Sequence, residues 1–316
     1  MAASDMGSTK RYVAGIVWQE CFRRAAFLPV PRPCRRIYDM LSSPAMIFRL
    51  RVPRAPLSHF VENLWFYQDL EANHTKEKLL PDASVELIID LSEGPKKLYP
   101  RQDTLSYTGY HRCWISGMQR RYIVIGVEKG SSMMGVHFRT GGAAPFLGFP
   151  ISELTGNVVE MDLIWKREIL SLREQLLEAE GPDAKFDLLE AYLVGKAQSL
   201  LEPDKTISAA LATLHSWPVI PLRQLASQLG VSHKQMIARF DCCVGLTPKL
   251  TSRVLRFRKS LATACSLTTP DWSDLAVTCG YYDQAHFIHE FQQFAGMTPS
   301  DYHRNHSEYQ HYVPLD

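Results

Sequence analysis

Basic side chains gather in one short stretch of the chain, between Ser232 and Lys259. Within these 28 residues seven basic side chains stand against a single acidic one, Asp241, whereas the whole chain has a formal net charge of only +2. The seven are Lys234, Arg239, Lys249, Arg253, Arg256, Arg258 and Lys259. Such a concentration of positive charge indicates a surface that binds a polyanion; a solvated helix face is the alternative.

Two helical patterns include or follow this basic stretch, and both are interrupted and restarted by the same kinds of residue. Each begins with an apolar helical face, stops at a glycine that can adopt a left-handed backbone, and restarts at a residue that caps helix N-termini well. The glycines are Gly230 and Gly280, and the capping residues are Ser232 and Asp283. A helix, a tight turn and a capped second helix make a helix-turn-helix unit, so the sequence predicts two such units.

The exits of the two units repeat as well. A phenylalanine, a glycine and a proline follow in the same order, at Phe240, Gly245 and Pro248 in the first unit and at Phe291, Gly296 and Pro299 in the second. Between the units, residues 249–264 are predicted to form one long helix. That helix would fix the separation of the two units.

The outward face of each second helix follows from its core face. Met236 and Phe240 are predicted to point inward in the first unit, and Phe287 and Phe291 in the second. The side chains left to face a partner are His233, Lys234, Ile237 and Ala238, then Gln284, Ala285, His286 and His289. Side chains of these types can read the donor and acceptor pattern of base edges in a major groove.

Four arginines near these helices are predicted phosphate contacts, which would position the protein without specifying sequence. They are Arg239, Arg253, Arg256 and Arg258. For Arg256, a buried structural role within the long helix is the alternative interpretation.

The second unit resembles the signature of the AraC/XylS family of bacterial transcription regulators. The residues that carry the resemblance run from Gly280 through Tyr281, Tyr282, Asp283, Gln284, Ala285 and His286 to Phe287, and continue with Phe291, Gly296, Met297, Thr298, Pro299 and Tyr302. The resemblance covers about residues 205–304. It implies base contacts by Lys234, Ile237, Ala238, Ala285, His286 and His289. At Ala238 the family often has a polar residue, which predicts a weaker or more hydrophobic readout by the first unit.

Residues 47–159 show short β-branched strands separated by glycine-containing breakers, which predicts a small sandwich or barrel. Residues 57–154 also resemble, more loosely, a sensor-like domain that precedes this DNA-binding region in some family members. The resemblance rests on the stretch from Leu80 to Leu87 and on Gly135 to Arg139. Two helical patterns follow, over about 163–177 and 186–201.

The predicted fold class is therefore α+β. The expected parts are a poorly ordered basic extension (1–45), a β-rich sensor-like domain (46–160), a helical connector or dimerisation region with a linker (161–204), an AraC-type DNA-binding domain (205–306) and a tail (307–316). The two helix-turn-helix units and their joining helix make the fourth part all-α.

Composition restricts the remaining possibilities. Seven cysteines without a repeated CxxC spacing predict neither a disulfide framework nor a zinc site. The chain contains no long apolar run, so we expect no membrane partner. Together with the cysteine pattern this predicts a cytoplasmic protein, and we expect neither a metal nor a cofactor. The expected partners are double-stranded DNA, a small-molecule effector, a second copy of the chain and, for an activator, RNA polymerase.

Two other function classes compete with a regulator that is not an enzyme. A cupin-like metal enzyme would use His59, His74, His111 and His137, but these histidines are scattered singly. An alkyl-accepting sensor would use Cys113, whose thiol pKa Arg112 would lower.

Overall fold

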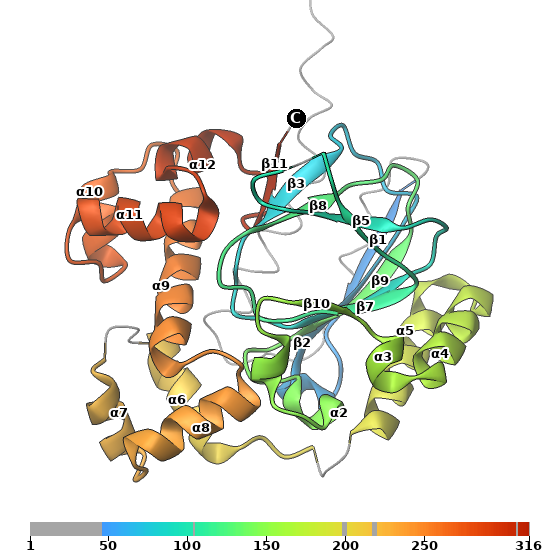
Figure 1. Cartoon of the computed structure of the whole chain (residues 1–316), viewed down its shortest axis with the longest axis horizontal. Coiled ribbons are helices and arrows are strands. Elements are labelled where there is room, and N and C mark those ends of the chain that lie inside the picture. The colour runs from blue at the N-terminus through green and yellow to red at the C-terminus, as the bar shows by residue number, and fades with distance from the viewer. Residues whose placement is uncertain (1–45, 104, 198–200, 217–219, 308, 316) are drawn as a thin grey trace, which may run out of the picture.

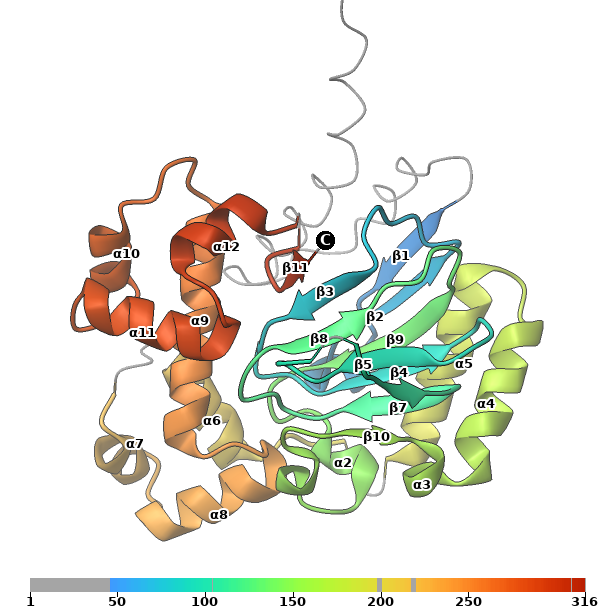
Figure 2. The same ribbon diagram turned by 45° about the horizontal axis from the view of Figure 1, so that its top comes forward.

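The computed structural model describes residues 46–103, 105–197, 201–216, 220–307 and 309–315. The basic extension expected over residues 1–45 lies outside the described residues. Figures 1 and 2 show a β-rich N-terminal domain beside a C-terminal arrangement of helices around the long helix α9. This confirms the predicted α+β class.

Two antiparallel sheets form the N-terminal domain. The first has the order β1-β2-β9-β4-β7-β10, with bounds Ile47–Arg51, Val61–Gln68, Met133–Phe138, Glu86–Asp90, Cys113–Ser116 and Val158–Glu160. The second has the order β11-β3-β8-β5-β6, with bounds Tyr312–Pro314, Lys76–Leu79, Ile123–Gly126, Lys96–Tyr99 and Thr108–Tyr110. Alternation along β2 explains its place, since Leu64 and Phe66 share one face and are buried, whereas Trp65 and Tyr67 on the other face are half-buried.

Short helical elements close the domain. They are the 3-10 helices η2 (Leu57–His59) and η3 (Ile151–Leu154) and the helices α2 (Ala144–Leu147) and α3 (Asp162–Trp165). The longer α4 (Arg167–Glu178) and α5 (Gly181–Lys196) follow and pack on each other. Arg173 of α4 donates to the backbone oxygens of Asp90 and Ser92, at 2.6 and 3.2 Å, which ties this helix to the end of β4.

Seven helices make up the C-terminal region. In chain order they are α6 (Lys205–Ser216), α7 (Leu222–Gln228), α8 (His233–Cys243), α9 (Pro248–Cys265), α10 (Trp272–Thr278), α11 (Gln284–Ala295) and α12 (Pro299–Asn305), as counted over the described residues. Helices α7 and α8 form the first helix-turn-helix unit, and α10 and α11 form the second. The long helix α9 joins them, as the sequence predicts (Figure 1).

The end of the chain departs from the expected tail. Residues 312–314 form β11, which pairs antiparallel with β3 in the N-terminal domain, so that Tyr312 lies opposite Leu79 and Pro314 opposite Glu77. Val313 is buried. The backbone N–H of Leu80 also donates to the oxygen of His311 at 2.8 Å. A segment that follows the two helix-turn-helix units in sequence thus belongs to a sheet of the other domain.

Candidate nucleic-acid interface

Both units end their first helix in the same way. Gly230 and Gly280 have φ of 66° and 83°, the left-handed region that glycine enters at no steric cost. The N–H of Val231 returns to the oxygen of Ala226 at 3.1 Å, and that of Tyr281 to Ala276 at 2.8 Å. Each turn is therefore a Schellman motif, which satisfies carbonyls at the end of the first helix and aims the second helix.

The second helices begin at the predicted caps. The Ser232 hydroxyl accepts from the N–H of Gln235 at 3.2 Å, and the Gln235 side chain accepts in return from the N–H of Ser232, which makes a capping box. Asp283 caps α11 by accepting from the N–H of His286 at 2.7 Å. These bonds fix the orientation of the first turn of each helix, where base contacts are expected.

The structure places both predicted outward faces on the surface. The exposed side chains include all eight base-contact candidates: His233, Lys234, Ile237, Ala238, Gln284, Ala285, His286 and His289. Met236, Phe240, Phe287 and Phe291 are buried, as the core assignment requires.

An aromatic core holds the second unit on α9. Phe257 of α9 contacts the rings of Phe291 and Phe294, with centroids 5.2 and 5.0 Å away. Trp272 of α10 stacks on Phe287 at 6.2 Å. Because these rings come from three helices, α11 has little freedom to rotate about its axis.

A buried carboxylate completes this packing. Glu290 of α11 is 3% exposed, and its two oxygens accept from Arg256 and Arg253 of α9, each at 2.7 Å. Sequence reasoning missed Glu290, although its position three residues after Phe287 puts an acidic group on the core face opposite a basic helix. That placement is the signal that could have identified it.

Arg256 does not lie where a phosphate contact requires. It is buried, its guanidinium pairs with Glu290, and its charge lies 4.4 Å from the centre of the Tyr281 ring. The placement corrects the assignment of Arg256 as a DNA contact and supports the structural alternative. Arg253 is partly exposed beside Gln293, and Arg239 is exposed and paired with Asp204, so both stay candidate phosphate contacts.

The exit of each unit rests on the N-terminal domain. Gly245 packs against Ile151, and its oxygen accepts from the Thr155 hydroxyl at 2.5 Å. Gly296 lies against the Tyr122 ring, so a Cβ built on Gly296 would be 2.2 Å from that ring. Gly245 and Gly296 have positive φ, 86° and 64°. A side chain at either position would also collide with the N-terminal domain.

Helix α11 also receives part of its C-terminal capping from the other domain. The N–H of Tyr122 donates to the oxygen of Phe294 at 2.8 Å, and the Lys78 ammonium lies 3.4 Å from the oxygen of Gly296. The last carbonyls of a helix have no partner within the helix. The N-terminal domain therefore satisfies carbonyls at the end of this recognition helix.

A half-buried group of charged side chains connects α9 to the first sheet. Arg258 of α9 lies 3.6 Å from Glu62 of β2, while His137 of β9 lies 3.4 Å from Asp82 and 3.7 Å from Glu86. Burial alone would lower the pKa of His137, but Glu86, Asp82 and Glu62 raise it to about 9. His137 is therefore a cation at neutral pH.

The same environment acts in the opposite direction on two neighbours. Burial would raise the pKa of Asp82, but His137, His311 and Arg258 lower it to about 2. Burial and the nearby cations Arg258 and His137 lower the pKa of His311 to about 4, against the opposing effect of Asp82. Oppositely charged groups from both domains thus meet in one half-buried cluster.

The two competing function classes gain no support from these positions. In the part of the chain that the structure describes, no group of three or more histidine, cysteine or acidic side chains is arranged to hold a metal ion. Burial raises the pKa of the Cys113 thiol to about 12, and Arg173 and Arg112 offset only part of that rise. This is opposite to the lowered pKa that an alkyl-accepting cysteine needs.

Two family models match the chain. Residues 50–160 match a domain family of unknown function, and residues 225–305 match a helix-turn-helix domain family. The comparison with curated proteins gave no match. Across the described residues, every helix is too short or too polar to traverse a lipid bilayer.

Solved structures with a similar arrangement are also found. ToxT from Vibrio cholerae O395 is 10% identical, with 81% of this chain and 97% of that chain covered and a TM-score of 0.42. The C-terminal domain of AraT, a response regulator from Geobacillus stearothermophilus, is 20% identical, with 32% of this chain and 85% of that one covered and a TM-score of 0.30. A DNA-binding transcriptional dual regulator from Escherichia coli K-12 is also 20% identical, with coverages of 34% and 96% and a TM-score of 0.29.

Proposed function

We propose that the C-terminal region, which matches a helix-turn-helix domain family, is of the AraC/XylS type and that the protein is a sequence-specific transcription regulator that reads two successive major grooves. One observation carries the proposal. Two capped second helices expose their predicted base-reading faces while the same helix, α9, holds both units.

The arrangement suits double-stranded DNA for geometric and electrostatic reasons. A major groove admits one α-helix, and successive grooves on one face of the duplex are about 34 Å apart. A rigid joining helix lets one chain occupy a site of about two turns. Lys234 lies on the first face and can donate to guanine, and His286 on the second can donate or accept.

Selection of bound sequences from a random DNA pool tests the proposal directly. The full-length chain should enrich one motif with two parts, each assigned to one recognition helix. His286→Ala should relax base preference in the part read by α11 and leave the other part intact. His59→Ala is the matched control, because His59 is an exposed histidine on the N-terminal domain. Equal losses of His286→Ala on selected and random DNA would refute the base contact.

We also propose that the N-terminal domain controls DNA binding, by sensing a small molecule or by dimerising. The support is that both recognition helices end on this domain, at Gly245 and at Gly296. Any shift of the Tyr122 or Thr155 segments would therefore reach the base-reading elements. Sedimentation of the free and DNA-bound chain tests dimerisation, and a thermal-shift screen with small molecules tests sensing. A monomer in both states that no compound stabilises would refute this proposal.

A further inference from the structure

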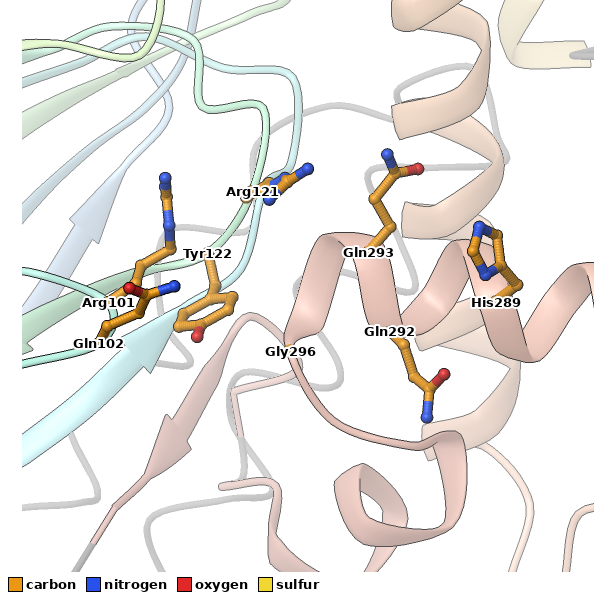
Figure 3. Close-up of a pocket in the computed structure, with 8 residues that line it drawn as sticks. All are labelled: Arg101, Gln102, Arg121, Tyr122, His289, Gln292, Gln293 and Gly296. Carbon is orange, nitrogen blue, oxygen red and sulfur yellow. The ribbon is translucent and has the colours of Figure 1, made fainter.

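A cleft of about 460 Å³ opens between α11 and the nearest edge of the N-terminal domain. Figure 3 shows its two walls. Arg101, Gln102, Arg121 and Tyr122 come from the N-terminal domain, and His289, Gln292, Gln293 and Gly296 come from α11 and its exit. The cleft therefore joins a predicted base-reading residue, His289, to a part of the molecule outside the helix-turn-helix domain.

The lining of this cleft is basic and rich in hydrogen-bond donors. Arg101 and Arg121 are exposed, and none of the eight lining residues is a carboxylate. Neither guanidinium is paired with an acidic side chain of the described residues. Two unpaired cations beside neutral amides make a surface suited to an anion, and a guanidinium can bind a phosphate with two parallel hydrogen bonds.

The position of the cleft beside α11 points to a DNA phosphate as the anion. Ala285, His289 and Gln292 follow one line along α11, with spacings that keep them on one face, so the predicted base-reading face runs directly into the cleft. A helix in a major groove is flanked by the two phosphate backbones of that groove. A cation that faces the helix from the side lies where one backbone passes.

The wall that carries Arg121 is held in place. Its chain neighbour Tyr122 donates its N–H to Phe294 of α11 at 2.8 Å, and the Tyr122 ring packs on Gly296. Arg121 is therefore kept beside α11 by a backbone hydrogen bond and not only by its own flexible side chain. Preorganisation of this kind lowers the cost of forming a contact.

We propose that Arg101 and Arg121 of the N-terminal domain bind the DNA backbone that flanks the α11 groove, so that this domain is part of the DNA-binding surface. The inference rests on the proposed function, since it needs α11 in a major groove. It extends that function, because the contacts lie outside both helix-turn-helix units.

The test compares the full-length chain with the Arg101→Ala/Arg121→Ala variant on the selected sequence and on random DNA. Binding is measured by fluorescence anisotropy over a salt series, and hydroxyl-radical footprinting maps the backbone contacts. Each phosphate contact contributes about 0.9 to the slope of log affinity against log salt, so the slope should flatten by about 1.8. Affinity should fall by roughly tenfold per arginine at low salt, by equal factors on both DNAs, as expected for charge-assisted hydrogen bonds.

The footprint should also lose protected backbone positions beside the α11 half of the site. The control is Arg167→Ala, which removes an exposed arginine at the start of α4, on the side of the molecule away from α11 (Figure 1). It should leave slope and footprint unchanged. Circular dichroism melts of all variants report folding, which substitutions at these exposed positions should not alter.

Several outcomes would overturn the inference and leave the proposed function intact. One is an unaltered salt slope and footprint in the double variant while His286→Ala still relaxes base preference. Another is tighter DNA binding by the double variant, which would show that the cleft opposes DNA. A third comes from calorimetry with inorganic phosphate and no DNA: phosphate binding that the double variant loses, with DNA affinity unchanged, would assign the cleft to a free anion.

Discussion

Removal of the buried Glu290 carboxylate should lower the local stability of the second recognition helix, α11. Glu290→Ala leaves two arginines of α9 without the oxygens they donate to. Their situations differ, because the Arg253 side chain is 29% exposed and can turn to water, whereas the Arg256 side chain is 11% exposed. The consequence therefore depends mainly on Arg256.

The size of the effect follows from this difference. Breaking a buried ion pair by removing one partner costs about 3–5 kcal/mol, while an exposed pair contributes about 0–1 kcal/mol. Arg256 keeps its contact with the Tyr281 ring and a long hydrogen bond, 3.4 Å, to the oxygen of Gly280. We therefore expect about 3 kcal/mol, at the lower end of the buried range.

Hydrogen exchange followed by mass spectrometry suits this measurement, because it reports the opening free energy of each segment separately. Peptides from α9 and α11 should lose protection by about 100-fold, which corresponds to about 3 kcal/mol. Peptides from β4 and β9 should not change. Glu174→Ala, at an exposed position of α4, is the matched control and should leave all peptides unchanged.

A second variant separates a lost charge partner from a lost side chain. Glu290→Ala/Arg256→Met replaces the buried cation by an apolar chain of similar length and should recover most of the protection. If the double variant exchanges as fast as Glu290→Ala, or if Glu290→Ala exchanges like the unaltered protein, the argument from an unpaired buried charge is wrong.

Four further predictions concern the contact between the domains and the thiols. The contribution of His137 to stability is complete below its ordinary pKa near 6.5 and lost as pH rises through about 9, an effect on the order of 3 kcal/mol, so urea unfolding of His137→Phe should show a flatter decline over that range. His311 acts in the opposite direction, since its lowered pKa costs stability as pH falls from 6.5 toward 4, and His311→Phe should remove that loss; unchanged pH profiles would contradict both assignments. Gly296→Ala should loosen the domain contact, seen as faster proteolysis between the domains, because its φ is 64° and its methyl group would overlap a tyrosine ring; unchanged proteolysis would count against this contact. Iodoacetamide should label the exposed Cys242 long before the buried Cys113 in the native protein, and equal labelling rates in a peptide map would contradict the burial argument.

Local signals predicted the helix-turn-helix units well. Gly230, Ser232, Gly280 and Asp283 act through backbone conformation and hydrogen bonds within a few residues, so their types and spacing were sufficient. The change from strand to helix patterning likewise predicted the order of the two domains. That Ala238 and seven other side chains face outward followed from the helical period, while their contacts with bases stay a prediction.

Long-range features were not predictable in the same way. The burial of Arg256 depends on Glu290, 34 residues later in the chain. A run of basic residues has the same sequence pattern whether its side chains face solvent or a buried carboxylate. The pairing of β11 with β3 joins segments from opposite ends of the described chain, and three residues carry too little pattern to indicate a strand. Both features arise from tertiary contacts that no local rule encodes.

The place of β11 in the second sheet also means that this sheet can be completed only late in synthesis. During synthesis the N-terminal domain emerges first, but Tyr312, Val313 and Pro314 leave the ribosome only after the whole DNA-binding domain. Until then the β3 edge lacks this partner, and an open strand edge is a template for pairing with other chains. Nascent or truncated chains that end before residue 312 should therefore be the aggregation-prone forms of this protein, since only synthesis of β11 covers the edge of β3.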